Sequence, residues 1–302
     1  MKLRVGPSGV HFFDRTTGLN ILLDEVRLDR PHWSPAPRQV SIALTNVCDL
    51  KCPYCYAPKN VDALDFSRLL DWITELDEGG CLGVGFGGGE PTLYHRFAEL
   101  CSRVSHQTRL AVTFTTHGHG LDEGLLRDLR DTVHFVRVSV DGFGRTYERL
   151  RGRPFAAICR QLEMVRSLAP FGMNYVVNAL TVGDLDSVAA LATEAGAVEF
   201  LLLPQRPVAG LRGIDSETRQ KLATWVARYQ GNVRLAVSET DAHGFRFCDP
   251  FADEAGLSSY AHIDASGSLR RSSYDSVGVG IGGSGVMRAL EVLRNHCEDG
   301  VS

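Results

Sequence analysis

The stretch Cys48-Asp-Leu-Lys-Cys52-Pro-Tyr-Cys55 is the most specific motif in the chain. Its three cysteines are separated by three and then two residues, and they follow shortly after the apolar run 40–45. A loop with this spacing can wrap around one corner of an iron–sulfur cluster. Because such clusters normally take four protein thiolates, a set of three predicts a cluster in which one iron is open to another ligand.

A zinc site is the competing interpretation of these cysteines. A structural zinc ion would require a fourth Cys or His at short spacing. The nearest histidines along the chain are His32 and His95, which do not supply that pattern. The spacing therefore favours the iron–sulfur cluster.

The composition predicts a cytoplasmic protein that binds neither nucleic acid nor a membrane. A net charge of −4, from 32 Lys and Arg against 36 Asp and Glu, gives no electrostatic footprint for either partner. The start of the chain lacks the apolar core of a signal peptide, and no apolar run approaches the ~20 residues of a membrane helix. Eight cysteines in such a chain indicate metal or redox chemistry rather than disulfides.

Strand and helix patterns alternate between residues 38 and 210, which predicts an α/β fold with a parallel sheet. The strand patterns are 40–45, 83–86, 110–115, 134–140, 174–181 and 198–203, and the helix patterns are 62–78, 94–106, 121–131, 155–168 and 185–195. At 302 residues the chain is long enough for one such barrel-like domain with additions, or for two ordinary domains.

The two ends of the chain break this rhythm. Residues 1–37 hold two extended segments, 9–13 and 19–23, joined by a turn that contains Gly18, and a Pro-rich connector follows. Residues 211–302 hold a helix pattern near 215–229 and then short strand patterns at 233–237, 260–264 and 268–271. We therefore expect an N-terminal hairpin (1–37), a barrel domain (38–210) and a small C-terminal α+β cap (211–302).

The second strand pattern ends in Gly87-Gly-Gly-Glu-Pro91. Glycines let the backbone approach a ligand closely, and a carboxylate can accept a hydrogen bond from an ammonium group. Taken alone, the stretch is equally well explained by ordinary turn glycines. Its place at the end of the strand that follows the cysteine motif makes it a candidate binding loop.

Together, the cysteine motif, the aromatic Tyr54 before its last cysteine and the Gly-Gly-Glu loop resemble the radical S-adenosylmethionine (SAM) superfamily. This resemblance implies a partial (β/α)6 barrel and one [4Fe-4S] cluster on Cys48, Cys52 and Cys55. It also implies that SAM binds the open iron and is cleaved to a 5′-deoxyadenosyl radical, with an external electron donor such as a flavodoxin or ferredoxin. The SAM-binding residues implied are Tyr54, Gly88, Gly89, Glu90, Pro91, Ser139 and Asp141.

The sequence leaves the roles of Ser139, Asp141 and His117 open. Ser139 and Asp141 close the fourth strand pattern, where the family contacts the SAM ribose and carboxylate, but Asp141 is equally suited to a helix N-cap or a turn. His117 stands after the third strand pattern, where family members often have Asn. We expect it to line the pocket and assign it no further role.

The C-terminal segment resembles the SPASM or twitch extensions that follow many radical SAM barrels. Where those modules place cysteines for a second cluster, this chain has Ser272 and Ser273. Cys248 and Cys297 alone are too few for a cluster, which predicts a degenerate cap. We expect the other cysteines, Cys81, Cys101 and Cys159, to be core residues.

A lone cap cysteine resembles the radical SAM epimerases of aminoglycoside biosynthesis. The implied function is inversion of a sugar carbon, with Cys248 returning hydrogen as a neutral thiol to the face opposite the abstraction. A polycationic substrate would require nearby carboxylates, for which Glu239, Asp241 and Asp249 are candidates. The alternatives are an enzyme that modifies a ribosomal precursor peptide, which the N-terminal hairpin and the cap would bind, and a non-enzymatic iron–sulfur carrier or sensor.

Overall fold

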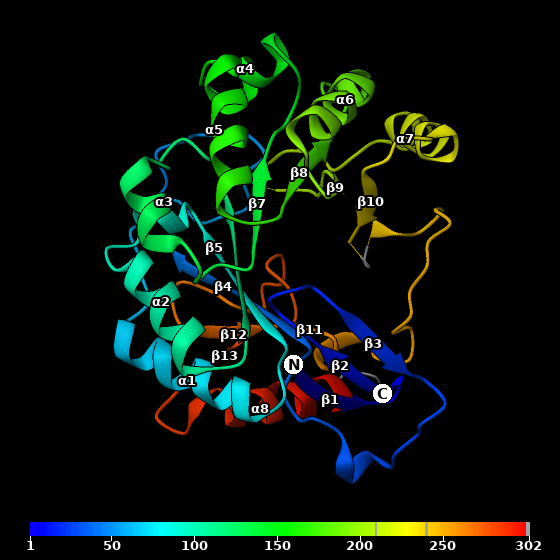
Figure 1. The fold of residues 1–302 in the computed structure, drawn as a ribbon. Coiled ribbons are helices and arrows are strands. Elements are labelled where there is room, and N and C mark those ends of the chain that lie inside the picture. The colour runs from blue at the N-terminus through cyan, green and yellow to red at the C-terminus, as the bar shows by residue number, and fades with distance from the viewer. Residues whose placement is uncertain (209, 239–240, 300–302) are drawn as a thin grey trace.

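The computed structural model describes residues 1–208, 210–238 and 241–299, the last three of these by their backbone alone. In these residues the main element is a twisted sheet whose strand order is β10-β9-β8-β7-β6-β5-β4-β11-β12-β13 (Figure 1). Every helix in this part of the chain is too short or too polar to cross a lipid bilayer.

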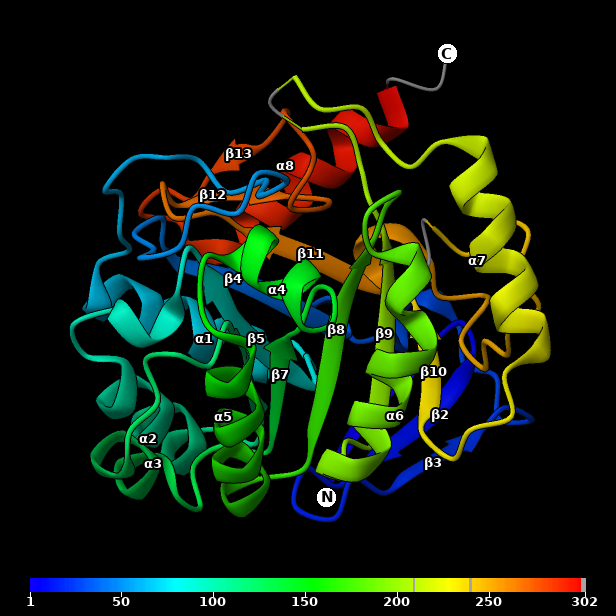
Figure 2. The same cartoon turned by 90° about the horizontal axis from the view of Figure 1, so that it is seen from above.

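The strands from β4 to β10 follow one another in sequence and pair in parallel. They are β4 (Gln39–Thr45), β5 (Gly83–Gly88), β6 (Ala111–Thr116), β7 (Phe135–Ser139), β8 (Phe171–Val177), β9 (Glu199–Pro204) and β10 (Arg234–Val237). The helices between them are α1 (Phe66–Glu78), α2 (Phe97–Gln107), α3 (Glu123–Leu129), α4 (Arg145–Arg151), α5 (Phe155–Leu168), α6 (Leu185–Ala195) and α7 (Ser216–Arg228). Seen from above, these helices lie on one side of the curved sheet (Figure 2). The predicted α/β class with a mostly parallel sheet is confirmed.

The sheet continues past β4 into the C-terminal segment. Strand β11 (Tyr260–Ile263) pairs in parallel with β4, and the hairpin β12 (Ser268–Arg270) and β13 (Val279–Gly280) extends the sheet antiparallel. Helix α8 (Gly285–Asp299) packs against α1. All three strands that the sequence assigns to a separate cap, 233–237, 260–264 and 268–271, therefore belong to the barrel sheet.

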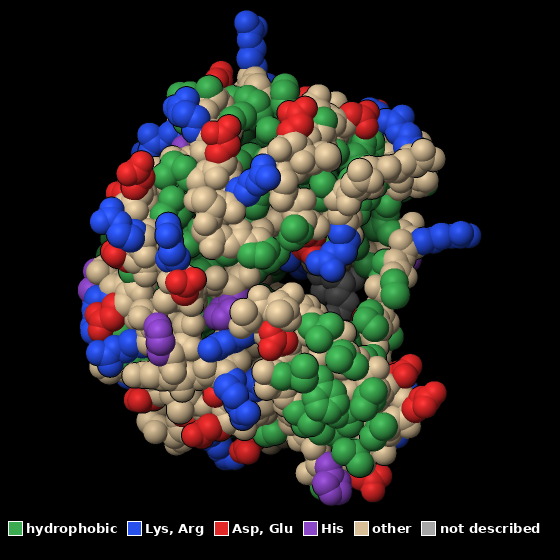
Figure 3. Space-filling model, in the orientation of Figure 1, with side chains coloured by type: hydrophobic (Ala, Val, Ile, Leu, Met, Phe, Trp, Pro, Cys, Tyr) green, Lys and Arg blue, Asp and Glu red, His purple; other side chains and the backbone are tan. Residues whose placement is uncertain are grey.

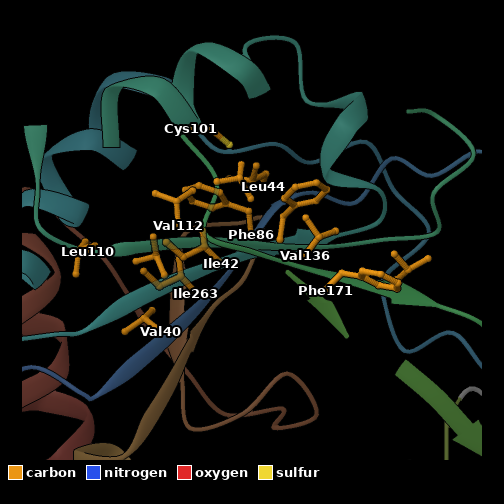
Figure 4. Close-up of a cluster of buried hydrophobic side chains, with 14 of the residues drawn as sticks. Val40, Ile42, Leu44, Phe86, Cys101, Leu110, Val112, Val136, Phe171 and Ile263 are labelled. Carbon is orange, nitrogen blue, oxygen red and sulfur yellow. The ribbon is translucent and has the colours of Figure 1, made fainter. Parts of the chain in front are cut away.

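Alternation along the strands separates an apolar outer face from a polar inner face. Outward side chains such as Val40, Ile42 and Phe86 are completely or almost completely buried under the helices, and they form the cluster drawn in Figure 4. Inward positions carry polar groups: the Ser41 hydroxyl lies 2.6 Å from Nδ1 of His262 and 2.5 Å from the Tyr260 hydroxyl. The inside of the barrel is thus built to contact polar ligands rather than to form a second core.

The N-terminal segment is a three-stranded antiparallel sheet rather than the predicted two-stranded hairpin, because residues 2–6 add a strand. Its strands are β1 (Lys2–Gly6), β2 (Gly9–Phe13) and β3 (Asn20–Leu23). Lys2 Nζ lies 2.5 Å from the carboxylate of Asp77, near the end of α1, and Arg4 Nε donates to Glu254 at 2.8 Å. Arg38, directly before β4, pairs with the same Glu254. The small sheet therefore sits at the amino end of the barrel strands.

Candidate functional site

The three cysteines of the motif lie on the loop that leaves the carboxyl end of β4, and all three are half-buried. The backbone N–H of Cys55 donates to the carbonyl of Cys52 at 3.2 Å, and that of Leu50 donates to Sγ of Cys48 at 3.4 Å. Burial raises the pKa of the Cys48 and Cys52 thiols, and Arg151 beside Cys52 opposes this shift. The loop thus gathers three thiols at one end of the barrel.

Asp141 fastens this cysteine loop to the barrel. Its carboxylate is almost completely buried; it accepts from the Tyr54 hydroxyl at 2.7 Å and from the Val176 N–H at 2.7 Å, and it pairs with the Arg151 guanidinium. Arg151 also donates to Sγ of Cys52 at 3.4 Å. Burial and then the Asp141 charge raise the pKa of Tyr54 far above its ordinary value, which keeps this hydroxyl protonated as a donor.

This network gives two predicted SAM-binding residues, Tyr54 and Asp141, clear protein partners. Burial lowers the pKa of the Arg151 guanidinium, but Asp141 together with the neighbouring Tyr54, Cys52 and Tyr147 raises it above its ordinary value. Both carboxylate oxygens of Asp141 are engaged by protein donors. Contact of Tyr54 or Asp141 with SAM remains a prediction, whereas support of the cysteine loop is visible in the structure.

Glu90, the acidic residue of the glycine loop, is 1% exposed and points toward the end of β6. One carboxylate oxygen accepts from the hydroxyls of Thr92 and Thr116 at 2.8 and 2.7 Å, and the other accepts from the His117 N–H at 2.9 Å. Pro91 follows at the start of a short 3-10 turn. Glu90 therefore fixes the loop after β6 as well as its own, and its role toward SAM remains a prediction.

The glycines of this loop are required by close backbone contacts. A Cβ atom on Gly88 would stand 2.2 Å from the Thr45 carbonyl, and one on Gly89 would stand 2.2 Å from the Val47 carbonyl. A Cβ on Gly87 would meet no atom within 4 Å. The loop is thus pressed against the chain that leads into the cysteine loop, and beside Gly87 it leaves room for a ligand, as a SAM site requires.

His117 connects the cysteine loop to the glycine loop, a contact that the sequence did not indicate. Its Nε2 lies 2.7 Å from a carboxylate oxygen of Asp49, within the cysteine motif, and its Nδ1 accepts from the His119 N–H at 3.0 Å. Arg153 donates to the other oxygen of Asp49 at 2.7 Å. Burial alone would raise the pKa of Asp49, but the contact with His117 and the hydrogen bond from Arg153 hold it below its ordinary value.

The same contacts bear on the zinc alternative. Among the described residues, ligand atoms of Cys48, Asp49 and His117 lie within 4.8 Å of one another. A histidine distant in sequence is therefore close to a motif cysteine after all. However, both ring nitrogens of His117 already have hydrogen-bond partners within the protein. The three thiols therefore remain the ligands that best fit a metal centre here.

The remaining predicted site residues are more dispersed. Ser139 ends β7 on the inner face of the sheet, paired in register with Asn174. Cys248 is exposed, and three residues further on Phe251 stacks under the Arg38 guanidinium, 3.5 Å from the ring centre, at the amino end of β4. Glu239 and the side chain of Cys297 lie outside the described residues. Cys81 and Cys101 are buried, and Cys159 is half-buried.

Comparison with known proteins was made for sequence and for fold. Residues 42–191 match the radical SAM superfamily. The chain is 31% identical to the mycofactocin maturase MftC of Mycobacterium ulcerans over 55% of this chain and 47% of that protein. It is 29% identical to the PqqA peptide cyclase of Ruegeria pomeroyi over 54% and 46%, and 28% identical to the Fe-coproporphyrin III synthase of Methanosarcina barkeri over 50% and 40%. It thus spans about half the length of these relatives.

Among solved structures, the chain resembles Streptococcus suis SuiB bound to S-adenosylmethionine, with a TM-score of 0.70 and 14% identity over 90% of this chain and 81% of that one. SuiB has also been solved bound to its precursor peptide SuiA, with a TM-score of 0.68. At this identity the likeness supports the fold alone.

The match, the three thiols and the open space beside the glycine loop agree with one another. The predicted cofactors, a [4Fe-4S] cluster and SAM, are confirmed by the family; Cys48, Cys52 and Cys55 would hold the cluster, which when bound supplies the electron that cleaves SAM. The aminoglycoside epimerase subfamily predicted from the lone cap cysteine is not supported by these relatives. Residues 42–191 form a domain of the radical SAM superfamily.

Proposed function

We propose that this chain modifies a precursor peptide by radical SAM chemistry, with an external one-electron reductant. This is the alternative that the sequence left open beside the sugar epimerase. The name of one relative, a PqqA peptide cyclase, and the precursor peptide bound to the structural neighbour SuiB support a peptide substrate. Because a porphyrin-named relative is nearly as similar, the proposal depends mainly on an observation in this chain.

That observation is the inverted polarity of the N-terminal sheet. The face turned toward the barrel carries Lys2, Arg4 and His11, which are 4%, 1% and 3% exposed. The opposite face carries two rows of apolar side chains, set by the strand register. The rows are Leu3, Phe12 and Ile21, and Val5, Val10 and Leu23. A small surface sheet normally buries its apolar face and exposes its charges, so this apolar face is suited to being covered by a partner.

Much of this apolar face is open at the surface, although Val10 in the middle strand is 8% exposed. Leu3, Ile21 and Leu23 are 50%, 40% and 42% exposed, and Figure 3 shows hydrophobic side chains gathered over this part of the molecule. Strand β3 is also an edge strand within the described residues, since β2 is its one neighbour. An extended peptide can add to such an edge and place alternate side chains on the apolar face.

The position of this sheet favours a polymeric substrate over a sugar. The sheet is held at the amino end of the barrel by the contact of Lys2 with Asp77 and by Glu254, which also pairs with Arg38. The thiols, in contrast, lie beyond the carboxyl end of β4. Seven residues of extended strand span roughly 23 Å. A peptide can bind at one end and react at the other, whereas an aminoglycoside is too small to contact both.

The sugar epimerase has less support. It requires the thiol of Cys248 to reach substrate beside SAM, but the neighbouring Phe251 contacts Arg38 at the opposite end of the barrel. In addition, Asp241, one of its proposed substrate carboxylates, is engaged by Arg206 at 3.4 Å.

The experiment measures 5′-deoxyadenosine formed by the reconstituted, reduced enzyme. It compares synthetic peptides encoded by short reading frames beside the gene with a panel of aminoglycosides. We expect one peptide to stimulate 5′-deoxyadenosine formation and to change in mass. Stimulation by an aminoglycoside, with no response to any peptide, would contradict the proposal.

Variants connect this response to the apolar face. Leu23→Asp and Ile21→Asp should raise the peptide concentration for half-maximal stimulation about tenfold or more, since burying such a side chain contributes roughly 1.5–3 kcal/mol. SAM cleavage without peptide should be unchanged. Val198→Asp is the matched control, because Val198 is 49% exposed before β9 and outside the N-terminal sheet.

A further inference from the structure

Four side chains from four separate segments meet at the carboxyl end of the barrel. The Tyr56 ring, directly after Cys55, lies 5.0 Å from the Tyr274 ring, centre to centre and tilted by 44°. The Arg206 guanidinium stands over the Tyr274 ring, 4.7 Å from the ring centre, and pairs with Asp241 at 3.4 Å. We call Tyr56, Tyr274, Arg206 and Asp241 the mouth bridge.

The mouth bridge joins the two ends of an open sheet. Arg206 follows β9 and Asp241 follows β10, which form one edge of the sheet. Tyr56 follows β4, and Tyr274 lies in the turn between β12 and β13, toward the other edge. No strand pairing connects these edges in the described residues. The bridge therefore spans the open side of the barrel at the end where the thiols lie.

Tyr274 is the middle member and the one on which the span depends. It contacts the cysteine loop through Tyr56 and the β9 loop through Arg206. Beside this span, a cavity of about 450 Å³ is lined by Arg206, Asp241, Pro204 and Arg212. Tyr56 and Tyr274 are 42% and 46% exposed, so solvent reaches the rings, and such aromatic and cation–π contacts are individually weak enough to open without unfolding.

We propose that Tyr274 is a positioning residue for the radical reaction, whose ring holds Tyr56 and Arg206 together and so closes the mouth of the barrel beside Cys55. Closure slows the access of water and oxygen to the cluster. It also keeps SAM from being cleaved when no substrate is present, because the loop that carries Cys55 is held in one position. The proposal depends on the radical SAM domain and not on the identity of the substrate.

The test uses the reconstituted holoenzyme and three variants. Tyr274→Ala removes the ring, Tyr274→Phe keeps the ring and removes the hydroxyl, and Tyr229→Ala is the matched control. Tyr229 also has an aromatic neighbour at 5.0 Å, Trp225, but it lies after α7 and takes no part in the mouth bridge.

The first readout is independent of activity. Hydrogen–deuterium exchange should increase in the segments that contain Tyr56 and Arg206 when Tyr274 is Ala. Loss of the cluster's visible absorbance in air should accelerate about tenfold in Tyr274→Ala. This corresponds to a loss of about 1.4 kcal/mol from the free energy that favours the closed over the open mouth. The second readout is the amount of 5′-deoxyadenosine formed without substrate, which should also rise in Tyr274→Ala.

We expect Tyr274→Phe to behave within about twofold of the wild type, since the ring makes both contacts. Arg206→Gln added to Tyr274→Ala should not accelerate bleaching further, because Arg206 acts on the mouth through that ring. Wild-type exchange and bleaching in Tyr274→Ala would overturn the proposal. So would an equal effect of Tyr229→Ala, which would indicate general loosening of the fold.

Discussion

Replacing Asp141 with Asn tests whether this residue supports the cysteine loop or binds SAM. The buried carboxylate pairs with Arg151 and accepts from Tyr54 and from the Val176 N–H. Asn keeps the shape but removes the charge, and its NH₂ group faces donors. The Arg151 guanidinium, 11% exposed, then lies unpaired beside Cys52.

The expected cost follows from the burial of both partners. Breaking a buried ion pair by removing one partner costs about 3–5 kcal/mol. Since an Asn oxygen can still accept one of the three hydrogen bonds, we expect about 3 kcal/mol, a large share of the roughly 5–15 kcal/mol of a typical domain. Asp253→Asn is the matched control: Asp253 pairs with Arg27 at 3.1 Å with both side chains more than half exposed, so it should cost at most about 0.5 kcal/mol.

Two assays decide this prediction. The urea midpoint of unfolding should fall strongly in Asp141→Asn and stay unchanged in Asp253→Asn, and the iron retained after reconstitution should fall in parallel, because Tyr54 and Arg151 no longer hold the loop. A variant with normal iron and normal stability that binds SAM weakly would refute the reasoning and restore Asp141 as a SAM ligand.

Three further predictions concern other groups. Burial lowers the pKa of His262 to about 4, below the ~6.5 of the unfolded chain. The unfolded chain therefore binds a proton more readily than the folded protein, so the contribution of neutral His262 to folding stability is fully present above pH ~6.5 and is lost as the pH falls. Between pH 7 and 5 the wild type should lose about 2 kcal/mol more unfolding free energy than His262→Gln in urea titrations. Glu90→Gln should weaken SAM binding about tenfold, measured by equilibrium dialysis, with unchanged iron; equal affinity would remove Glu90 from the SAM site. Cys248→Ala should retain full product formation, whereas loss of product with normal SAM cleavage would revive the epimerase. Cys101→Ala, its control, should lower stability alone, as a buried cysteine loss.

Much of the fold could be predicted because the apolar periodicity is strong. Helix α5 was predicted with its observed bounds, and the barrel strands to within a few residues. Strand β10 was assigned to the cap because an eleven-residue connection, 205–215, interrupts the rhythm before α7. Helix α4 was missed since seven residues show too few turns, whereas α8, with buried Val286, Ala289, Leu290 and Leu293 at helical spacing, was readable and overlooked.

The site was predictable where it lies in a contiguous motif. The cysteines and the glycine loop are local patterns, and their chemistry follows from residue type and spacing. The connection of Asp49 through His117 to Glu90, and that of Arg151 to Cys52, join segments far apart in sequence. Such pairs depend on which strand ends become neighbours, information that periodicity does not contain.

Hydrogen transfer from peptide to cofactor tests the central claim most directly. A precursor peptide deuterated at its carbon-bound positions is incubated with the reduced holoenzyme and SAM, and the 5′-deoxyadenosine is analysed by mass spectrometry. If the chain is a peptide-modifying radical SAM enzyme, the 5′-deoxyadenosine gains deuterium and the peptide changes in mass. Unlabelled 5′-deoxyadenosine with every peptide, together with deuterium uptake from a labelled aminoglycoside, would contradict it.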